Sequence, residues 1–148
     1  MKERFEAFTV LISKISRNIR KIKNQEMAEY GLRSVHVTCL YYLYSAGSLT
    51  ATELCERCEE DKATISRALD HLEAEGFAVR ELQGDKRYKA PVSLTEKGKA
   101  AGKRVHSAVN RVLDDVGISL TDDQRRDFYT YLSVISDDLE KITFGLTK

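Results

Sequence analysis

The sequence contains little proline, no tryptophan and no long apolar run. Pro91 is its one proline, and its eight glycines form no linker, so nothing divides the 148 residues clearly into separate domains. No apolar run approaches the roughly 20 residues that span a bilayer. The first residues, MKERFEAFTVLISKI, are interrupted by charges, unlike a secretory signal. We therefore expect one cytoplasmic domain, or one domain with an appendage, that has no membrane partner.

Cysteine is also scarce, and the three cysteines suit a reducing compartment. Cys55 and Cys58 form a C-x-x-C motif, which can be redox-active or metal-binding. The motif falls within a predicted helix and has no second cysteine pair nearby. We interpret these cysteines and Cys39 as small buried side chains. A thiol- or metal-responsive sensor that uses Cys55 and Cys58 is the alternative hypothesis.

No nucleophile–base–acid constellation and no glycine-rich phosphate loop is evident, so we predict that the protein is not an enzyme.

Charged residues are plentiful and unevenly distributed along the chain, although the net charge is only +1. Eight cations and three anions lie between Arg80 and Arg104, whereas acidic residues gather near the C-terminus. A local cationic surface of this kind is what a protein needs in order to neutralise phosphates.

Hydrophobic periodicity and capping signals predict four helices, a β-hairpin and two further helices. Apolar residues at helical spacing indicate a long first helix that ends before Tyr30 and a second helix from Arg33 to about Ala46. The N-caps expected for the remaining four helices are Thr50, Asp61, Thr95 and Thr121. The corresponding helices are predicted at 51–58, 62–75, 96–116 and 122–144. The chain is thus expected to be mainly α-helical.

The helix predicted at 62–75 has one apolar face and one small polar face. The side chains expected to point inward are Ile65, Ala68, Leu69 and Leu72. The other face carries Ala63, Ser66, Arg67, Asp70 and His71. A small polar face of this kind can enter a DNA major groove, and the short link to the preceding helix is typical of a helix-turn-helix. The alternative is a structural helix with a solvated face.

The segment that follows predicts a hairpin with a cationic tip. Its strands are expected in FAVREL and YKAPVSL, at 77–82 and 88–94, and Gly84 and Asp85 are good turn residues. Lys86 and Arg87 project from the tip, where an arginine could enter a narrow minor groove. Asp85 is expected to orient Arg87. A solvated turn is the alternative.

The run from Leu49 to Ala100 resembles the MarR family of winged helix-turn-helix regulators. The matching motifs are LT-x-x-EL, DKATISRALDHLEAEGF, the D-K-R of the hairpin tip, and SLTEKG. The resemblance implies a single domain over 1–148 that forms a homodimer, with dimerisation helices at 1–30 and 96–148 and a winged DNA-binding region at 31–95. The apolar residues near both ends of the chain agree, since a small winged domain could not cover them. Such a dimer would bind a pseudo-palindromic operator in double-stranded DNA, and most members of the family are repressors.

The resemblance also implies which residues contact DNA. Ser66 and Arg67 are expected in the major groove, and Arg87 in the minor groove. The full set expected at the interface is Lys62, Ala63, Thr64, Ser66, Arg67 and His71 in the helix and Asp85, Lys86, Arg87 and Lys89 in the hairpin. His71 is expected to face solvent or phosphate. A helical protein–protein adaptor with an incidental basic hairpin is a third hypothesis.

A small-molecule effector is the remaining expectation. The resemblance implies a pocket between the dimer helices and the winged region, where His36, Tyr41, Tyr42 and Tyr44 could hold a phenolic or lipophilic compound. Ordinary packing is the alternative for these residues. His36 and His106 lie on helices that the resemblance places near each other, but no third ligand is evident. We therefore expect no metal and no cofactor.

Overall fold

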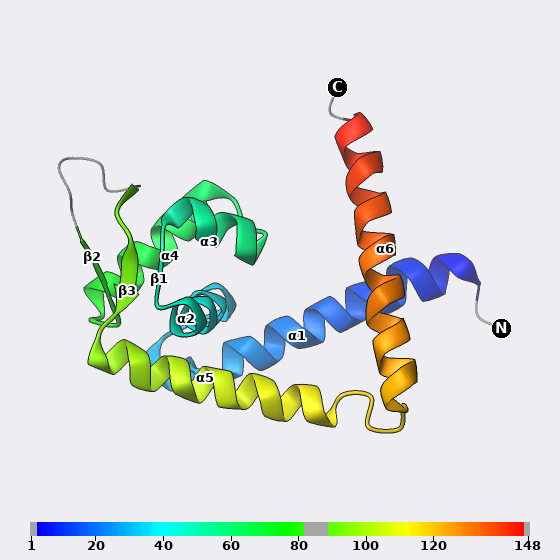
Figure 1. Ribbon diagram of the computed structural model, residues 1–148, viewed down its shortest axis with the longest axis horizontal. Coiled ribbons are helices and arrows are strands. Elements are labelled where there is room, and N and C mark those ends of the chain that lie inside the picture. The colour runs from blue at the N-terminus through cyan, green and yellow to red at the C-terminus, as the bar shows by residue number, and fades with distance from the viewer. Residues whose placement is uncertain (1–2, 82–88, 147–148) are drawn as a thin grey trace. The chain divides into compact units, whose positions relative to one another are not determined.

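The structure is a computed structural model that describes residues 3–81 and 89–146 (Figure 1). The predicted hairpin tip, with Asp85, Lys86 and Arg87, lies outside the described residues. The chain divides into two compact units, Met1–Val109 and Asn110–Lys148. No helix among the described residues is long and apolar enough to cross a membrane.

Most of the elements lie in the first unit. They are a π-helical stretch η1 (Glu6–Leu11), α1 (Ile12–Glu26), a 3-10 turn η2 (Ala28–Tyr30), α2 (Ser34–Ala46), β1 (Ser48–Leu49), α3 (Ala51–Cys58), α4 (Lys62–Ala74), β2 (Ala78–Arg80), β3 (Val92–Leu94) and most of α5 (Glu96–Asp115). The end of α5 and all of α6 (Asp122–Leu146) form the second unit. The predicted helices are thus confirmed in number and order, with ends that differ by a few residues at most.

Capping side chains fix where the helices start. The Thr50 hydroxyl accepts a hydrogen bond from the Glu53 backbone N–H at 3.2 Å, and the Glu53 carboxylate accepts one from the Thr50 N–H at 3.1 Å. Thr121 and Gln124 form the same reciprocal pair at the start of α6, at 2.9 and 3.1 Å. The Thr95 hydroxyl caps α5 by accepting from the Gly98 N–H and also donates to the Gly76 carbonyl. Short-range hydrogen bonds therefore set these boundaries.

The sheet has three antiparallel strands in the order β1-β3-β2. The expected hairpin is present in β2 and β3, with Ala78 opposite Leu94 and Arg80 opposite Val92. β1 was not predicted, because its two residues follow the glycine that ends α2 and look like part of a turn. It pairs with β3, with Ser48 opposite Ser93, and so makes β3 the central strand.

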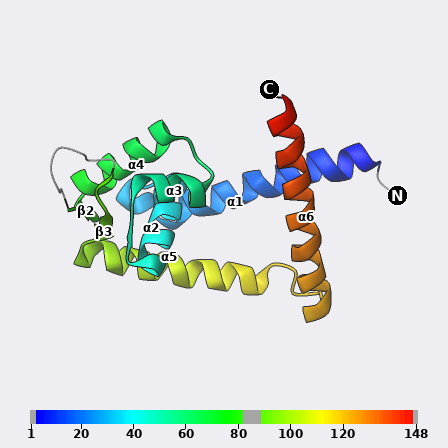
Figure 2. The ribbon, with the colours of Figure 1, turned by 45° about the horizontal axis from the view of Figure 1, so that its top comes forward.

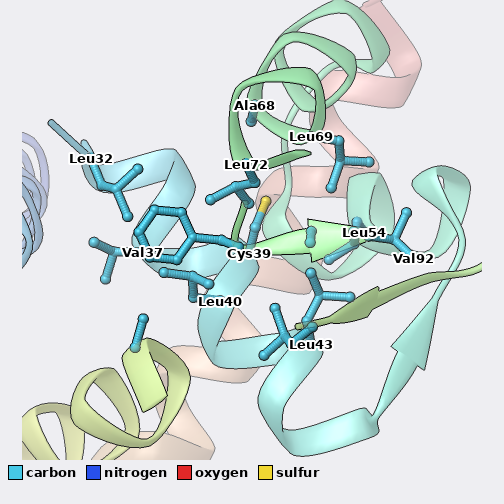
Figure 3. Packing of buried hydrophobic residues seen from close by; sticks show 14 of the residues in the cluster. Leu32, Val37, Cys39, Leu40, Leu43, Leu54, Ala68, Leu69, Leu72 and Val92 are labelled. Atoms are coloured by element: carbon cyan, nitrogen blue, oxygen red, sulfur yellow. The ribbon is translucent and has the colours of Figure 1, made fainter. Parts of the chain in front are cut away.

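The core of the first unit surrounds α2 (Figures 1 and 3). Helical spacing predicts one apolar face of α2 that consists of Leu32, Val35, Cys39, Leu43 and Ala46. This prediction was partly wrong: Ala46 is exposed and Val35 is half-buried, whereas Val37 and Leu40 are buried. The reason is that α2 meets partners on several sides, among them α1, α3, α4 and β3. Leu40 and Leu43 meet Leu54, Leu69, Leu72 and Val92 in a single cluster.

Two helices carry long apolar stripes that nothing within their own unit buries. In α6 the stripe repeats every three or four residues and consists of Phe128, Leu132, Ile135, Leu139, Ile142 and Leu146. Of these, Ile142 is 61% exposed and Leu132 is 40% exposed. The N-terminal helix carries a similar stripe of Phe8, Ile12, Ile15, Ile19 and Ile22, all at least 40% exposed. Such spacing is typical of helices that pack against another helix.

Gly98 lets α5 approach the end of α4, and it is the basis of a first prediction. A Cβ at this position would lie 1.9 Å from the Phe77 carbonyl oxygen and 2.9 Å from the carbonyl carbon. Both are backbone atoms and cannot turn away as a side chain would. We expect Gly98→Ala to lower the free energy of unfolding by about 2 kcal/mol or more, measured by urea denaturation.

Gly145 in α6 is the matched control, because a Cβ there meets nothing within 4 Å. Gly145→Ala should leave stability unchanged or raise it by up to about 1 kcal/mol, since alanine favours helix. Equal stability for Gly98→Ala and the native protein would contradict the close approach of α5.

Candidate nucleic-acid interface

Helices α3 and α4 form a tight helix-turn-helix. Glu59 ends α3 in the left-handed conformation, with φ of 53°, and Asp61 starts α4. The Asp61 carboxylate accepts a hydrogen bond from the Thr64 backbone N–H at 2.7 Å. This bond lowers the pKa of Asp61, and the nearby Arg67 lowers it further. The negative cap therefore stays ionised at the N-terminus of α4, where the helix dipole favours it.

The two faces of α4 lie as the sequence predicts. Ile65, Ala68, Leu69 and Leu72 are buried against the core. The expected DNA-contact residues Lys62, Ala63, Ser66 and Arg67 are exposed, and Thr64 is half-buried. The first half of α4 therefore presents small and polar side chains with two cations, and no bulky group would obstruct a groove.

His71 lies differently from the expectation that it faces solvent or phosphate. Its ring is half-buried and lies against that of His36 in α2, with ring centroids 4.8 Å apart. The buried Nε2 of His71 has no hydrogen-bond partner among the described residues. His71 thus belongs to the contact between α4 and α2. The helical wheel placed His71 with the polar face, and only the position of α2 shows that its ring is covered.

The base of the hairpin adjoins α4 (Figures 1 and 2). Lys89, which precedes β3, is exposed as expected. Arg80 at the end of β2 forms ion pairs with two carboxylates of α4, Asp70 and Glu73. The sequence pattern showed Arg80 only as one more cation of the basic segment. The signal that could have found it is the spacing of Asp70 and Glu73, which places both carboxylates on one side of the helix.

The residues expected to line an effector pocket do not form one group. Tyr41 and Tyr44 face α5, where the Tyr41 ring stacks on His106 with centroids 5.4 Å apart and Tyr44 lies 5.7 Å from the same ring. Tyr42 is half-buried and touches Tyr41 edge-on. His36 instead lies toward α4, against His71. The helices of His36 and His106 are neighbours, but each histidine has a different partner.

The cysteine that Cys58 contacts is not its partner in the C-x-x-C motif. Cys58 contacts the buried Cys39 of α2, and a hydrogen bond between the two thiols together with burial raises the pKa of Cys39. Burial raises the pKa of Cys55 as well, whereas the hydrogen bond with Cys39 lowers the pKa of Cys58. A thiol with a raised pKa carries little thiolate and reacts slowly with oxidants. Among the described residues, no three or more His, Cys, Asp or Glu side chains form a group that could hold a metal ion.

Helices α3 and α4, the tight link between them and the sheet that follows define a winged helix-turn-helix protein. Residues 30–87 match the sequence model of the MarR family. The transcriptional repressor YetL of Bacillus subtilis (strain 168) is 33% identical over 88 residues, which are 58% of this chain and 53% of the relative. The chain thus spans about half the length of that relative. The winged helix-turn-helix region of this chain is thus similar to the MarR family of HTH-type transcriptional regulators.

Solved structures share the fold over almost the whole chain. The MarR family regulator NMB1585 from Neisseria meningitidis is similar with a TM-score of 0.82 and 22% identity, over 99% of this chain and 100% of that one. MepR of S. aureus, solved as a complex with DNA, has a TM-score of 0.80 at 17% identity, over 93% of this chain and 99% of that one. The expected fold class is therefore confirmed: a mainly helical winged fold with N- and C-terminal helices.

The contact between His36 and His71 leads to a prediction about acid stability. Burial, His71 and Arg33 together lower the pKa of His36 to about 4, from the ordinary value near 6.5. Between these two pH values the unfolded chain binds a proton that the folded protein excludes, so the free energy of unfolding falls as the pH falls. We expect a loss of about 1 kcal/mol from pH 7 to pH 4.5 at this residue, allowing for solvent around the half-buried ring.

The variant His36→Gln tests this origin. The His36 Nδ1 accepts a hydrogen bond from the Arg33 backbone N–H at 2.9 Å, and a glutamine at the third helical position can accept the same bond without titrating. Urea denaturation should therefore show a flatter pH profile for His36→Gln than for the native protein. Parallel profiles for native protein and His36→Gln would contradict the assignment.

Proposed function

We propose that this protein is a homodimeric repressor that binds a pseudo-palindromic DNA operator. The observation that carries the proposal is the exposed, small and polar face at the start of α4, next to the base of a basic hairpin. In this reading Ser66 and Arg67 contact base edges in the major groove, and Lys62, Ala63 and Thr64 lie close to bases or phosphates. The name of YetL as a repressor supports repression over activation.

The hairpin supplies the second contact in this proposal. Arg87 enters the minor groove beside the half-site, Asp85 orients it, and Lys86 and Lys89 neutralise phosphates. The first three of these residues are proposed from the sequence motif alone. A helix in one groove and an arginine in the next grip the duplex at two points, which fixes the register of the domain on DNA.

The uncovered apolar stripes of α6 and of the N-terminal helix support the proposed dimer. A chain that leaves Leu132, Leu139 and Ile142 exposed gains hydrophobic free energy by covering them with a second copy. Two-fold symmetry would then present two α4 helices to one duplex, about 10 base pairs apart from centre to centre.

We further propose that a small compound regulates DNA binding. Tyr41, Tyr44 and His106 form an aromatic cluster between α2 and α5, and a flat phenolic or lipophilic compound could replace one ring in that stack. Such binding would alter the packing of α2 on α5 and thereby favour one spacing of the two DNA-binding regions over another. Tyr42, which touches Tyr41, is a secondary candidate, and His36, which lies toward α4, is the least supported of the four expected residues.

The DNA contact of Arg87 can be tested once an operator is known. Selection from random duplexes followed by sequencing should return a palindrome, and a gel-shift titration then measures affinity for it. We expect Arg87→Ala to weaken binding about tenfold or more, since one good arginine contact is worth about 1–3 kcal/mol. Lys103→Ala, which removes an exposed cation of α5, is the control and should bind almost normally. Unchanged affinity of Arg87→Ala would remove the minor-groove role.

The dimer can be tested by placing a charge on the stripe of α6. Leu139→Glu should shift the protein toward monomer in sedimentation at micromolar concentration, because a buried unpaired carboxylate is costly in an apolar interface. Val134→Glu introduces the same charge at an exposed apolar residue outside the stripe and should remain dimeric. Native protein that sediments as a monomer would refute the proposed dimer.

Salt dependence separates this function from the adaptor hypothesis. A protein that neutralises several phosphates loses orders of magnitude in DNA affinity between low and moderate salt, whereas an adaptor shows no such duplex binding. The sensor hypothesis finds less support from Cys39 and Cys55, whose pKa values are raised, than from Cys58, whose pKa is lowered.

A further inference from the structure

We infer that Arg80 is a positioning residue that holds the base of the hairpin against the recognition helix α4 and thereby aligns the two DNA contacts. This inference rests on the proposed DNA-binding function. It assigns a role to a residue that does not itself touch DNA. Three described residues, Arg80 in β2 and Asp70 and Glu73 in α4, carry it.

The guanidinium of Arg80 is held in place from two sides. Its Nη2 donates a hydrogen bond to Oδ1 of Asp70 at 3.0 Å, and its Nε faces Oε1 of Glu73 as an ion pair. Arginine suits this arrangement because its planar fork presents donors in fixed directions to more than one acceptor. Both carboxylates come from the same helix, so the side chain of Arg80 fixes the orientation of β2 relative to α4.

Burial makes this contact more than a surface ion pair. The side chain of Arg80 is only 7% exposed, and that of Glu73 is 23% exposed. Exposed ion pairs contribute little because water screens them, whereas a largely buried charge that loses its partners becomes unfavourable. Removing Arg80 would leave the half-buried Glu73 without this counter-charge, and α4 and β2 would separate or rotate so that water could reach the carboxylate.

The position of Arg80 in β2 explains why the alignment of the hairpin with α4 depends on this residue. β2 is only three residues long, and Arg80 is its last residue, opposite Val92 of β3. Residues beyond Arg80 lead to the basic hairpin, so a rotation at this base becomes a larger displacement farther out. Arg80 therefore holds β2 on α4 at the last residue of the strand.

A second effect of Arg80 is electrostatic. Asp70 is 58% exposed and lies on the same side of α4 as Ser66 and Arg67, three or four residues away. A bare carboxylate there would repel the phosphates that Lys62 and Arg67 attract. Arg80 compensates this charge, and because its own side chain is only 7% exposed it is poorly accessible to a phosphate.

The test measures operator affinity of the full-length protein as a function of salt for native protein, Arg80→Ala and Arg80→Lys. We expect Arg80→Ala to bind at least about tenfold more weakly while the slope of log affinity against log salt stays native, because no phosphate contact is lost. Arg80→Lys keeps the charge but loses the fork, and should recover part of the affinity. A slope reduced by about one would show that Arg80 itself contacts a phosphate and would overturn the inference.

The double variant Asp70→Asn, Glu73→Gln identifies the partners. It should weaken binding in the same way as Arg80→Ala, and combining all three substitutions should add little, because the same contact is removed once. Fully additive losses would overturn the inference. Native affinity of folded Arg80→Ala, with only its melting temperature lowered, would do so as well.

Amide hydrogen exchange of the free protein decides the inference without DNA. In Arg80→Ala, amides of β2 and β3 should exchange faster, while those of α2 stay native. Native exchange rates in β2 and β3 would refute the positioning role. If the native protein retained no duplex, the proposed DNA-binding function would fail, and the exchange result would still show whether Arg80 holds β2 on α4.

Discussion

The burial of one face of α4 against α2 is the constraint on which the rest of the structure depends. Because Ile65, Leu69 and Leu72 are committed to the core, the opposite side of the helix must point outward. Ser66 and Arg67 on that side are exposed, so the core does not require them to be apolar. The proposed function therefore follows from hydrophobic burial before any DNA contact is considered.

Local signals made most of the fold predictable from the sequence. The reciprocal bonds of Thr50 with Glu53 and of Thr121 with Gln124 connect residues three apart, so the sequence contains everything that determines those helix starts. The inward face of α4 was also predictable, because the spacing of its apolar residues follows from helix geometry and needs no distant contact. The order of the elements and the hairpin were also predicted from periodicity, capping and turn signals, and the structure has both.

What could not be predicted depends on contacts between distant residues. β1 exists only because β3 offers it a partner, and nothing in Ser48 and Leu49 alone indicates a strand. The half-buried position of the His71 ring depends on its contact with His36 in a different helix. The role of Arg80 depends on the orientation of a strand relative to a helix, which no periodicity describes. The wrong face expected for α2 has the same origin, because a helix with partners on several sides has no single apolar stripe.

The charge balance of the chain makes correct placement of its cations especially important. With a net charge of only +1, the whole protein exerts little long-range attraction on a polyanion. Affinity for DNA must then come from a few cations that meet phosphates and base edges at the right positions, and each of them is worth only about 1–3 kcal/mol. A hairpin that drifted relative to α4 would forfeit those contacts without a strong background attraction to compensate. The structure answers this requirement with a guanidinium shared between Asp70 and Glu73, which keeps α4 and the strand that leads to the hairpin in one fixed orientation.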